Sequence, residues 1–274
     1  MQIIGFALAI TIGVTLGLIG GGGSILTVPV LVYVLRIEPV HATAYSLFIV
    51  GLSAAVGSIA YLRRGQVRLD VALTFGFPAV IAVYATRRFL VPSIPAEICR
   101  IVSFTCSRDF AIMALFALLM LLASVSMIRR GRSGGIERDD DGWHGQPRGV
   151  RFYLAVLAEG IVVGTLTGVV GAGGGFLIVP ALVLLAGLDM KSAVGTSLVI
   201  IAFKSLIGFT GDLGSALVID WPVLLTFAAL TVAGILLGTV ASKRVSAARL
   251  KPAFGWFVLV MGSLILVREL VGLA

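Results

Sequence analysis

Two clusters of small residues, 151 positions apart, are the feature of this sequence best suited to chemistry. The first cluster contains Gly20, Gly21, Gly22, Gly23 and Ser24, and the second contains Gly171, Gly173, Gly174 and Gly175. Glycine costs a helix interior about 1 kcal/mol relative to alanine, so each cluster is expected to break a helix. The start of the short segment that follows would then present free backbone N–H groups and a positive dipole, which bind anions.

Three hydroxyl side chains could add hydrogen bonds to an oxyanion at this place. They are Ser46 in the first half of the chain and Thr196 and Ser197 in the second half. Ser46 and Ser197 are themselves 151 positions apart. The competing fate of each hydroxyl is a hydrogen bond to a backbone carbonyl one turn earlier in its helix.

Two charged residues fall deep inside apolar segments, where charges are costly and often functional. Lys204 could hold an anionic substrate or carry a proton, and Glu159 could pair with it or be the proton-coupling carboxylate. The competing interpretations are a lysine that extends to the membrane surface and a protonated glutamate that only hydrogen-bonds a neighbouring helix. The other twenty basic residues, Arg87 among them, are expected in loops or at helix ends, and Asp212 is expected as a solvated cap.

The glycines also have a simpler interpretation, in which small residues only let helices pack closely. The repetition of four consecutive small residues, each time before a short apolar segment, favours a substrate role. Nucleotide binding is not supported, because no strand precedes either cluster and no Gly-Lys-Ser/Thr follows it. The motifs His-Glu-x-x-His and Gly-x-Ser-x-Gly and paired intramembrane carboxylates are absent, so no enzyme is expected and no cofactor or metal site is assigned.

The composition shows which elements must position these residues. Of 274 residues, 59% are hydrophobic and 12% are charged. Soluble domains carry roughly 25% charged residues, so most soluble folds are excluded and lipid is the expected surrounding. The net charge of +8 is therefore expected to show which ends of the helices face the cytoplasm, where basic residues are enriched. Nucleic acid is not an expected partner. The two cysteines, Cys99 and Cys106, form no disulfide framework or Cys-x-x-Cys site and are expected in loops or at helix ends.

Long apolar runs predict an all-α membrane protein with about eight to ten transmembrane helices, since a crossing takes roughly 20 residues. The long runs are 2–19, 40–62, 69–89, 110–128, 152–170, 193–213, 221–241 and 253–267, and two shorter runs are 24–35 and 176–188. No cleavable signal peptide is expected, because the first run has no basic region before it. A polar loop at 129–151 joins the two halves.

The short runs either cross the membrane or re-enter from one side. If all ten runs cross, fourteen basic residues lie on one side and six on the other. If the short runs re-enter, the basic residues divide equally. The positive-inside rule therefore favours ten crossings, with both termini outside and the loop 129–151 in the cytoplasm.

An internal repeat organises these segments. Sliding the sequence by 151 residues aligns 17–29 with 168–180 and 42–47 with 193–198 without a gap. This predicts a first transmembrane repeat at 1–128 and a second at 152–274. Since five crossings is an odd number, the two five-segment repeats must be inserted in opposite orientations. Inverted repeats are typical of secondary transporters, which bind substrate at the repeat interface and work by alternating access.

The sequence resembles the TauE/SafE family of sulfite exporters. The resemblance depends on Gly-Gly-Gly-Gly-Ser-Ile-Leu-Thr-Val-Pro at 20–29, Gly-Ala-Gly-Gly-Gly-Phe-Leu-Ile-Val-Pro at 171–180 and Ala-Val-Gly-Thr-Ser-Leu at 193–198. It implies a permease of the bacterial inner membrane that moves sulfite or organosulfonate anions, driven by an ion gradient. Residues 42–46 and 94–108 depart from the family pattern.

Several functional alternatives stay open at this point. The substrate could be another small anion such as a carboxylate, or the chain could be a non-catalytic membrane subunit of a larger complex. The expected partners are a small anionic substrate and membrane lipid. A homodimer is compatible with the sequence.

Overall fold

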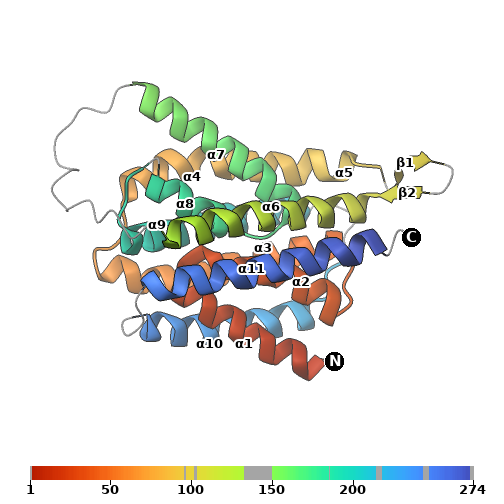
Figure 1. Cartoon of the computed structure of the whole chain (residues 1–274), viewed down its shortest axis with the longest axis horizontal. Coiled ribbons are helices and arrows are strands. Elements are labelled where there is room, and N and C mark those ends of the chain that lie inside the picture. Colours follow the sequence, from red (N-terminus) through yellow and green to blue (C-terminus); the bar gives the residue numbers. More distant parts are fainter. Residues whose placement is uncertain are drawn as a thin grey trace.

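The apolar runs of the sequence form helices, most of which lie roughly parallel to one another, whereas α7 (Val150–Val170) crosses the others obliquely (Figure 1). The computed structural model describes residues 2–95, 97–101, 104–132, 150–184, 186–213, 218–242 and 247–271. The first half contains α1 (Gln2–Ile19), the 3-10 segment η1 (Gly20–Leu26), α2 (Thr27–Pro29), the π segment η2 (Val30–Val34), α3 (Pro39–Arg63), α4 (Leu69–Ala85), the π segment η3 (Thr86–Leu90), α5 (Val91–Ser93) and α6 (Arg108–Arg132). The second half contains α7 (Val150–Val170), α8 (Gly175–Leu184), α9 (Met190–Asp212), α10 (Trp221–Ala241) and α11 (Ala247–Val271).

Each of the ten predicted apolar runs is helical, which confirms an all-α membrane fold. Four helices among the described residues are long and apolar enough to cross a bilayer: Pro39–Arg63, Leu69–Ser93, Lys191–Asp212 and Trp221–Ala241. Gly5–Ile19, Gly23–Val34 and Val156–Val170 are shorter apolar helices. Most of the predicted loop 129–151 lies outside the described residues, between α6 and α7.

A small β-hairpin adds to the helical architecture. It pairs β1 (Glu97–Ile101) with β2 (Phe104–Ser107) in antiparallel fashion, and its register sets Cys99 opposite Cys106. The sequence placed this stretch in a loop or at helix ends, so the strands were not foreseen. Figure 1 shows the hairpin at the same end of the bundle as both chain termini, and α6 ends at the opposite end.

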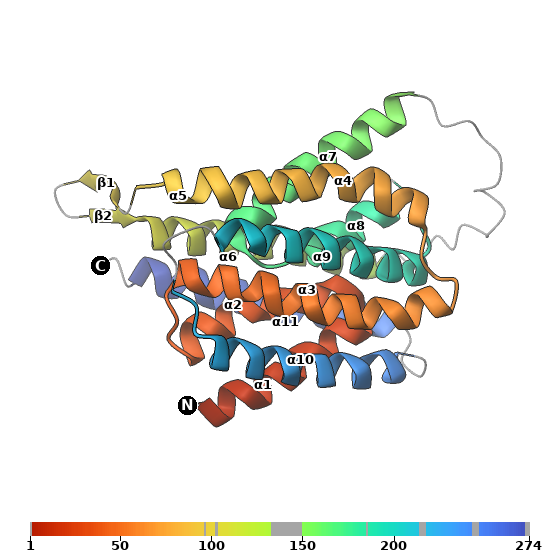
Figure 2. The ribbon, with the colours of Figure 1, turned by 180° about the vertical axis from the view of Figure 1, so that it is seen from behind.

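Every long helix has its principal neighbour in the other half of the chain. Helix α1 packs on α10, α4 on α7, α3 on α9 and α6 on α11. Figure 2 shows one face of the bundle with the helices in the order α7, α4, α9, α3, α10 and α1. Under the sequence repeat α1 corresponds to α7, α3 to α9 and α4 to α10. The order therefore reads the same from both sides.

Glycines allow the closest of these approaches. A Cβ at Gly13 of α1 would lie 2.8 Å from the Cα of Gly234 in α10, and a Cβ at Gly164 of α7 would lie 2.6 Å from the carbonyl oxygen of Ala79 in α4. Small residues in helix faces are the usual way for membrane helices to pack, because lipid offers no hydrophobic drive for association. At these two positions the packing interpretation of glycine is therefore correct.

The central helices α3 and α9 run antiparallel. Gly51 of α3 faces Leu206 of α9, and Gly57 faces Leu198, so the numbering falls on one helix as it rises on the other. Two corresponding helices in opposite directions are what an inverted repeat requires. The inverted repeat as a whole stays a prediction.

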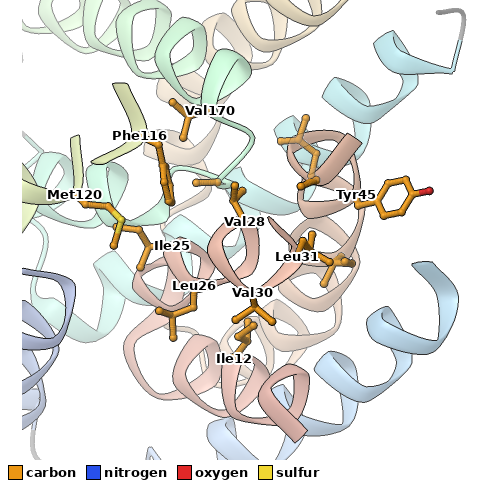
Figure 3. Close-up of a cluster of buried hydrophobic side chains, with 14 of the residues drawn as sticks. Ile12, Ile25, Leu26, Val28, Val30, Leu31, Tyr45, Phe116, Met120 and Val170 are labelled. Atoms are coloured by element: carbon orange, nitrogen blue, oxygen red, sulfur yellow. The ribbon is translucent and has the colours of Figure 1, made fainter. Parts of the chain in front are cut away.

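The short segment of the first half is held in the interior by side chains of other helices. Ile25, Val28 and Leu31 are fully buried, and they share a cluster with Ile12 of α1 and Phe116 of α6 (Figure 3). In a bilayer such a segment is stabilised mainly by close packing, because lipid tails are as apolar as leucine. This packing fixes where the first glycine break lies.

Candidate functional site

Left-handed glycines end the helices α1 and α7. Gly20 follows the last residue of α1 with φ of +71°, and Gly171 follows the last residue of α7 with φ of +72°. Glycine adopts this conformation without the cost that a Cβ adds, and it is a common helix terminator. The amide of Gly171 donates to the carbonyl of Thr167 at 2.8 Å, which closes the last turn of α7. Both predicted breaks are therefore present.

The two breaks differ after this point. Residues 20–26 continue as the 3-10 segment η1, whereas residues 171–174 form a turn before α8 begins at Gly175. The amides of Leu177 and Ile178 both donate to the carbonyl of Gly174 at 3.0 Å. The expected open break with free N–H groups at 20–23 is thus replaced in the first half by a tighter helix, in which Gly22 and Gly23 take part.

The breaks touch each other at the centre of the molecule. Gly21 of η1 and Gly175 of α8 approach so closely that a Cβ on either residue would overlap the backbone of the other. Because these residues come from different halves, the contact brings the two predicted clusters to one place. Any side chain at either position would force the halves apart.

Lys204 reaches this place from the middle of α9. Its side chain is fully buried, and its Nζ donates a hydrogen bond of 2.7 Å to the Oγ1 of Thr167 in α7. A Cβ at Gly174 would lie 2.7 Å from the same Nζ and would overlap the side chain of Thr167. Gly174, with φ of +69°, therefore leaves space that the ammonium group occupies. Lys204 does not extend to the membrane surface.

Ser24 of η1 contacts the second break at Gly173. Its Oγ donates to the carbonyl of Gly21 at 2.6 Å, and its Cβ lies 3.4 Å from where a Cβ on Gly173 would be. The structure thus brings together six of the predicted residues, which we call the central site: Gly21, Ser24, Gly173, Gly174, Gly175 and Lys204.

Several buried hydroxyls of the central elements lack a hydrogen-bond partner among the described residues. They are Thr27, Ser46, Ser53 and Ser205. Ser53 is the residue that the repeat aligns with Lys204. A buried hydroxyl without a partner carries a desolvation cost of about 1–3 kcal/mol, so each of these groups could gain by donating to a ligand.

Lys204 is the ionisable residue of the central site. Within the described ranges, no carboxylate lies within ion-pair distance of Lys204, and no group of three or more His, Cys, Asp and Glu side chains could hold a metal ion. A buried lysine that is protonated lacks a countercharge here, and a bound anion would supply it.

The remaining predicted residues lie elsewhere or have other partners. Thr196 accepts a hydrogen bond of 3.0 Å from the amide of Arg68, and the Oγ of Ser197 donates to the carbonyl of Val194 at 2.8 Å. Gly20 and Gly171 lie against Val194 and Thr43, on the outer sides of the breaks. Glu159 is half-buried and lies eight residues before Thr167, about 12 Å along α7.

Sequence reasoning missed one buried ion pair and misplaced both of its members. Arg87 is fully buried and Asp212 is 2% exposed, and the Nε of Arg87 lies 3.2 Å from the Oδ2 of Asp212. Arg87 is therefore not a loop residue, and Asp212 is not a solvated helix cap. The helix that begins at Leu69 continues past the predicted end at residue 89, through η3 and α5 to Ser93, so Arg87 is not at a helix end.

The comparison with known proteins agrees with this architecture. The family described as "Sulfite exporter TauE/SafE" matches residues 5–265. The chain is 30% identical over 261 residues to a protein of Xylella fastidiosa (strain 9a5c) named "Probable membrane transporter protein", covering 94% of this chain and 92% of that one. It is 28% identical over 228 residues to "Probable membrane transporter protein YunE" of Bacillus subtilis (strain 168), covering 74% and 76%. No solved structure is significantly similar to it.

The family match spans nearly the whole chain, including both glycine breaks and Lys204. Both relatives are named as probable membrane transporter proteins. The chain belongs to the sulfite exporter TauE/SafE family and is a multi-pass membrane protein of the transporter type.

Proposed function

We propose that this protein is a secondary transporter of small anions, with sulfite or an organosulfonate as the substrate. The observation that carries the proposal is the fully buried ammonium group of Lys204, which has a threonine hydroxyl as its hydrogen-bond partner and no carboxylate at ion-pair distance among the described residues. A small oxyanion would neutralise this charge. The family name supports a sulfur oxyanion over other anions.

The substrate would bind where the two glycine breaks meet. Lys204 would supply the charge, Ser53 would supply a hydroxyl donor, and the start of α8 would supply backbone N–H groups and a positive dipole. Gly174 leaves the space that the Lys204 amine occupies. The site would therefore select small oxyanions by their charge.

Alternating access would follow from motion between the halves. The antiparallel course of α3 and α9 and the exchange of neighbours between the halves support an inverted repeat. In such a frame the site can open to one side when the halves tilt in one sense and to the other side when they tilt back. The contact of Gly21 with Gly175 would be the point about which they tilt.

The excess of basic residues supports an orientation in a bacterial inner membrane. With ten crossings, the side that carries the loop 129–151 holds fourteen basic residues and would face the cytoplasm. The end that carries both termini and the β-hairpin would face outward. Reporter fusions at Ala274 and within 133–149 would test this orientation.

The test of the transport proposal is uptake of labelled sulfite into liposomes that contain the purified protein. Lys204→Ala should lower the initial rate at least tenfold, because the anion loses its charged partner. Lys191→Ala is the matched control, since Lys191 is an exposed lysine at the start of the same helix and should leave the rate unchanged. Equal rates for all three proteins would contradict the site.

Competition defines the substrate class. Unlabelled sulfite and taurine-like sulfonates should reduce uptake, whereas acetate should not. Competition by acetate alone would indicate a carboxylate transporter with the same site. Absence of uptake unless a second protein is added would indicate a subunit of a larger complex.

A further inference from the structure

The buried pair of Arg87 and Asp212 joins the two halves of the chain. Arg87 lies in η3 of the first half, Asp212 is the last residue of α9 in the second half, and their side chains meet at 3.2 Å. A contact between the halves can hold one arrangement of the two halves until the contact breaks. Neither residue belongs to the central site.

The pair also contacts the second glycine break through one residue. The Nη1 of Arg87 donates to the Oγ1 of Thr43 in α3 at 3.1 Å, and that hydroxyl donates to the carbonyl of Val40 at 2.8 Å. Thr43 contacts Gly171 so closely that a Cβ on Gly171 would overlap Thr43. Arg87 therefore holds three parts of the fold together: η3, the end of α9 and the start of α3 next to the break.

The guanidinium group is not fully satisfied. Its Nη2 is buried and has no hydrogen-bond partner among the described residues. Buried ion pairs contribute little net stability, because desolvation of the two charges offsets their attraction. An incompletely bonded pair in a membrane domain is therefore better explained by a switching role than by a stabilising one.

From this geometry we propose that Asp212 is the proton-coupling carboxylate of transport, and that its pair with Arg87 is a latch between the halves that opens on protonation. This inference rests on the proposed transport function. The carboxylate takes one proton from water and becomes neutral, so its attraction to Arg87 falls and the end of α9 is released. The proton returns to water when the pair forms again, and the O–H bond of the carboxyl group is the one covalent bond that forms and breaks.

The coupling would pass along α9. Lys204 lies eight residues before Asp212 on this helix, about 12 Å away. Movement of the α9 end would shift the Lys204 ammonium group against Thr167 and the glycine break. Proton binding at Asp212 and anion binding at Lys204 would then favour the same conformation, which is the requirement for coupled transport.

Other titratable groups lie on the elements around the latch, among them Tyr45 of α3 and Arg108 and Asp109 of α6. Arg88 follows Arg87 in η3, Tyr84 lies one turn before Arg87 in α4, and Asp220 caps α10. His41 of α3 lies 3.3 Å from Glu38 at the start of its helix. Segments η1 and α8 contain no titratable side chain. Lys204 is the further charged residue of α9 near its middle. Glu159, the sequence-based candidate for coupling, has no basic partner within ion-pair distance among the described residues.

Two transport measurements separate coupling from transport itself. Liposomes with purified protein are tested for exchange of labelled for unlabelled sulfite without a gradient, and for accumulation of labelled sulfite under a gradient of one pH unit. At one proton per anion the wild-type protein should accumulate sulfite up to about tenfold. Asp212→Asn should keep exchange and show no accumulation. Glu159→Gln, the matched control, should keep both.

The double variant Arg87→Gln with Asp212→Asn guards against misfolding, because it removes both charges together. It should also exchange without accumulating. The proposal is overturned if Asp212→Asn accumulates sulfite as the wild type does, if Glu159→Gln alone loses accumulation, or if the double variant is folded and loses exchange as well.

A third measurement needs no substrate. The ring of Trp221 lies 6.4 Å from that of Phe209, three residues before Asp212. With Trp143 and Trp256 replaced by Phe, Trp221 fluorescence should change with pH in the wild-type background and in His41→Gln, but not in Asp212→Asn. A change that persists in Asp212→Asn overturns the latch. If the wild type moves no sulfite, the transport proposal fails, and the fluorescence titration still decides the latch.

Discussion

The Nζ of Lys204 donates a 2.7 Å hydrogen bond to the hydroxyl of Thr167, and both side chains are buried. This bond joins the middle of α9 to the last turn of α7, directly before the second glycine break. The bond fixes the position of the terminal amine, because a lysine side chain without such a partner has many conformations. Thr167 is therefore a positioning residue of the central site.

Thr167→Val should raise the KM for sulfite about tenfold or more, because a hydrogen bond to a charged group contributes about 1.5–3 kcal/mol. Thr167→Ser keeps the hydroxyl and should stay within about twofold of the wild type. Thr165→Val, on the same helix but outside the central site, serves as the control. A KM unchanged in Thr167→Val would show that Lys204 does not need this partner.

Ser53→Ala should separate binding from stability. Ser53 is buried with no hydrogen-bond partner among the described residues, so its removal should leave the melting temperature unchanged or raise it. The KM should nevertheless rise between about twofold and tenfold, because the bound anion loses a hydroxyl donor. Thermal unfolding and uptake kinetics on the same preparation check both parts. A lower melting temperature with an unchanged KM would assign Ser53 to the fold.

Thr196→Val should have the opposite effect. The hydroxyl of Thr196 accepts a hydrogen bond from the backbone amide of Arg68. The variant removes this bond and should lower the free energy of unfolding by about 1 kcal/mol. The KM should not change, since the hydroxyl is engaged away from the central site. Thr210→Val is the control, because the exposed Thr210 bonds only within its own helix turn. A raised KM in Thr196→Val would restore the sequence-based assignment of this residue.

Gly21→Ala and Gly175→Ala should both prevent folding or abolish uptake, because either Cβ would overlap the backbone of the other break. Gly76→Ala is the matched control, since its Cβ would meet Ile200 at an ordinary 3.7 Å. In a helix interior that change should be neutral or stabilise by up to about 1 kcal/mol. Size-exclusion profiles in detergent and sulfite uptake provide the readouts. Normal uptake by Gly21→Ala would mean that the breaks separate during transport.

Hydropathy and the repeat predicted most of the architecture. The bounds of α1 and α10 coincide with the predicted runs 2–19 and 221–241, because a membrane helix is defined by one local property, its apolar length. The glycine breaks were predicted for the same reason: four small residues in a row weaken a helix whatever surrounds them. Lys204 was identified because a single charge in a long apolar run is visible in the sequence.

What the sequence did not reveal depends on contacts between distant segments. Thr167 is an ordinary helix residue until the structure sets it against Lys204. Arg87 and Arg88 look like the end of a crossing, and only the continuation of the helix to Ser93 and the approach of α9 bury the first of them. The strands Glu97–Ile101 and Phe104–Ser107 hold Cys99 and Cys106, which were expected in loops or at helix ends, and their pairing is a contact between two segments that no local pattern shows.

The exchange of principal neighbours between the halves has an evolutionary consequence. Since α1 packs on α10, α4 on α7, α3 on α9 and α6 on α11, neither half could bury its helix faces alone. If the chain arose by gene duplication, the ancestral five-helix protein needed a second copy of itself, inserted in the opposite direction, to complete the fold. Fusion through the segment 133–149 would then have allowed the copies to diverge, leaving a lysine at 204 in one and a serine at 53 in the other.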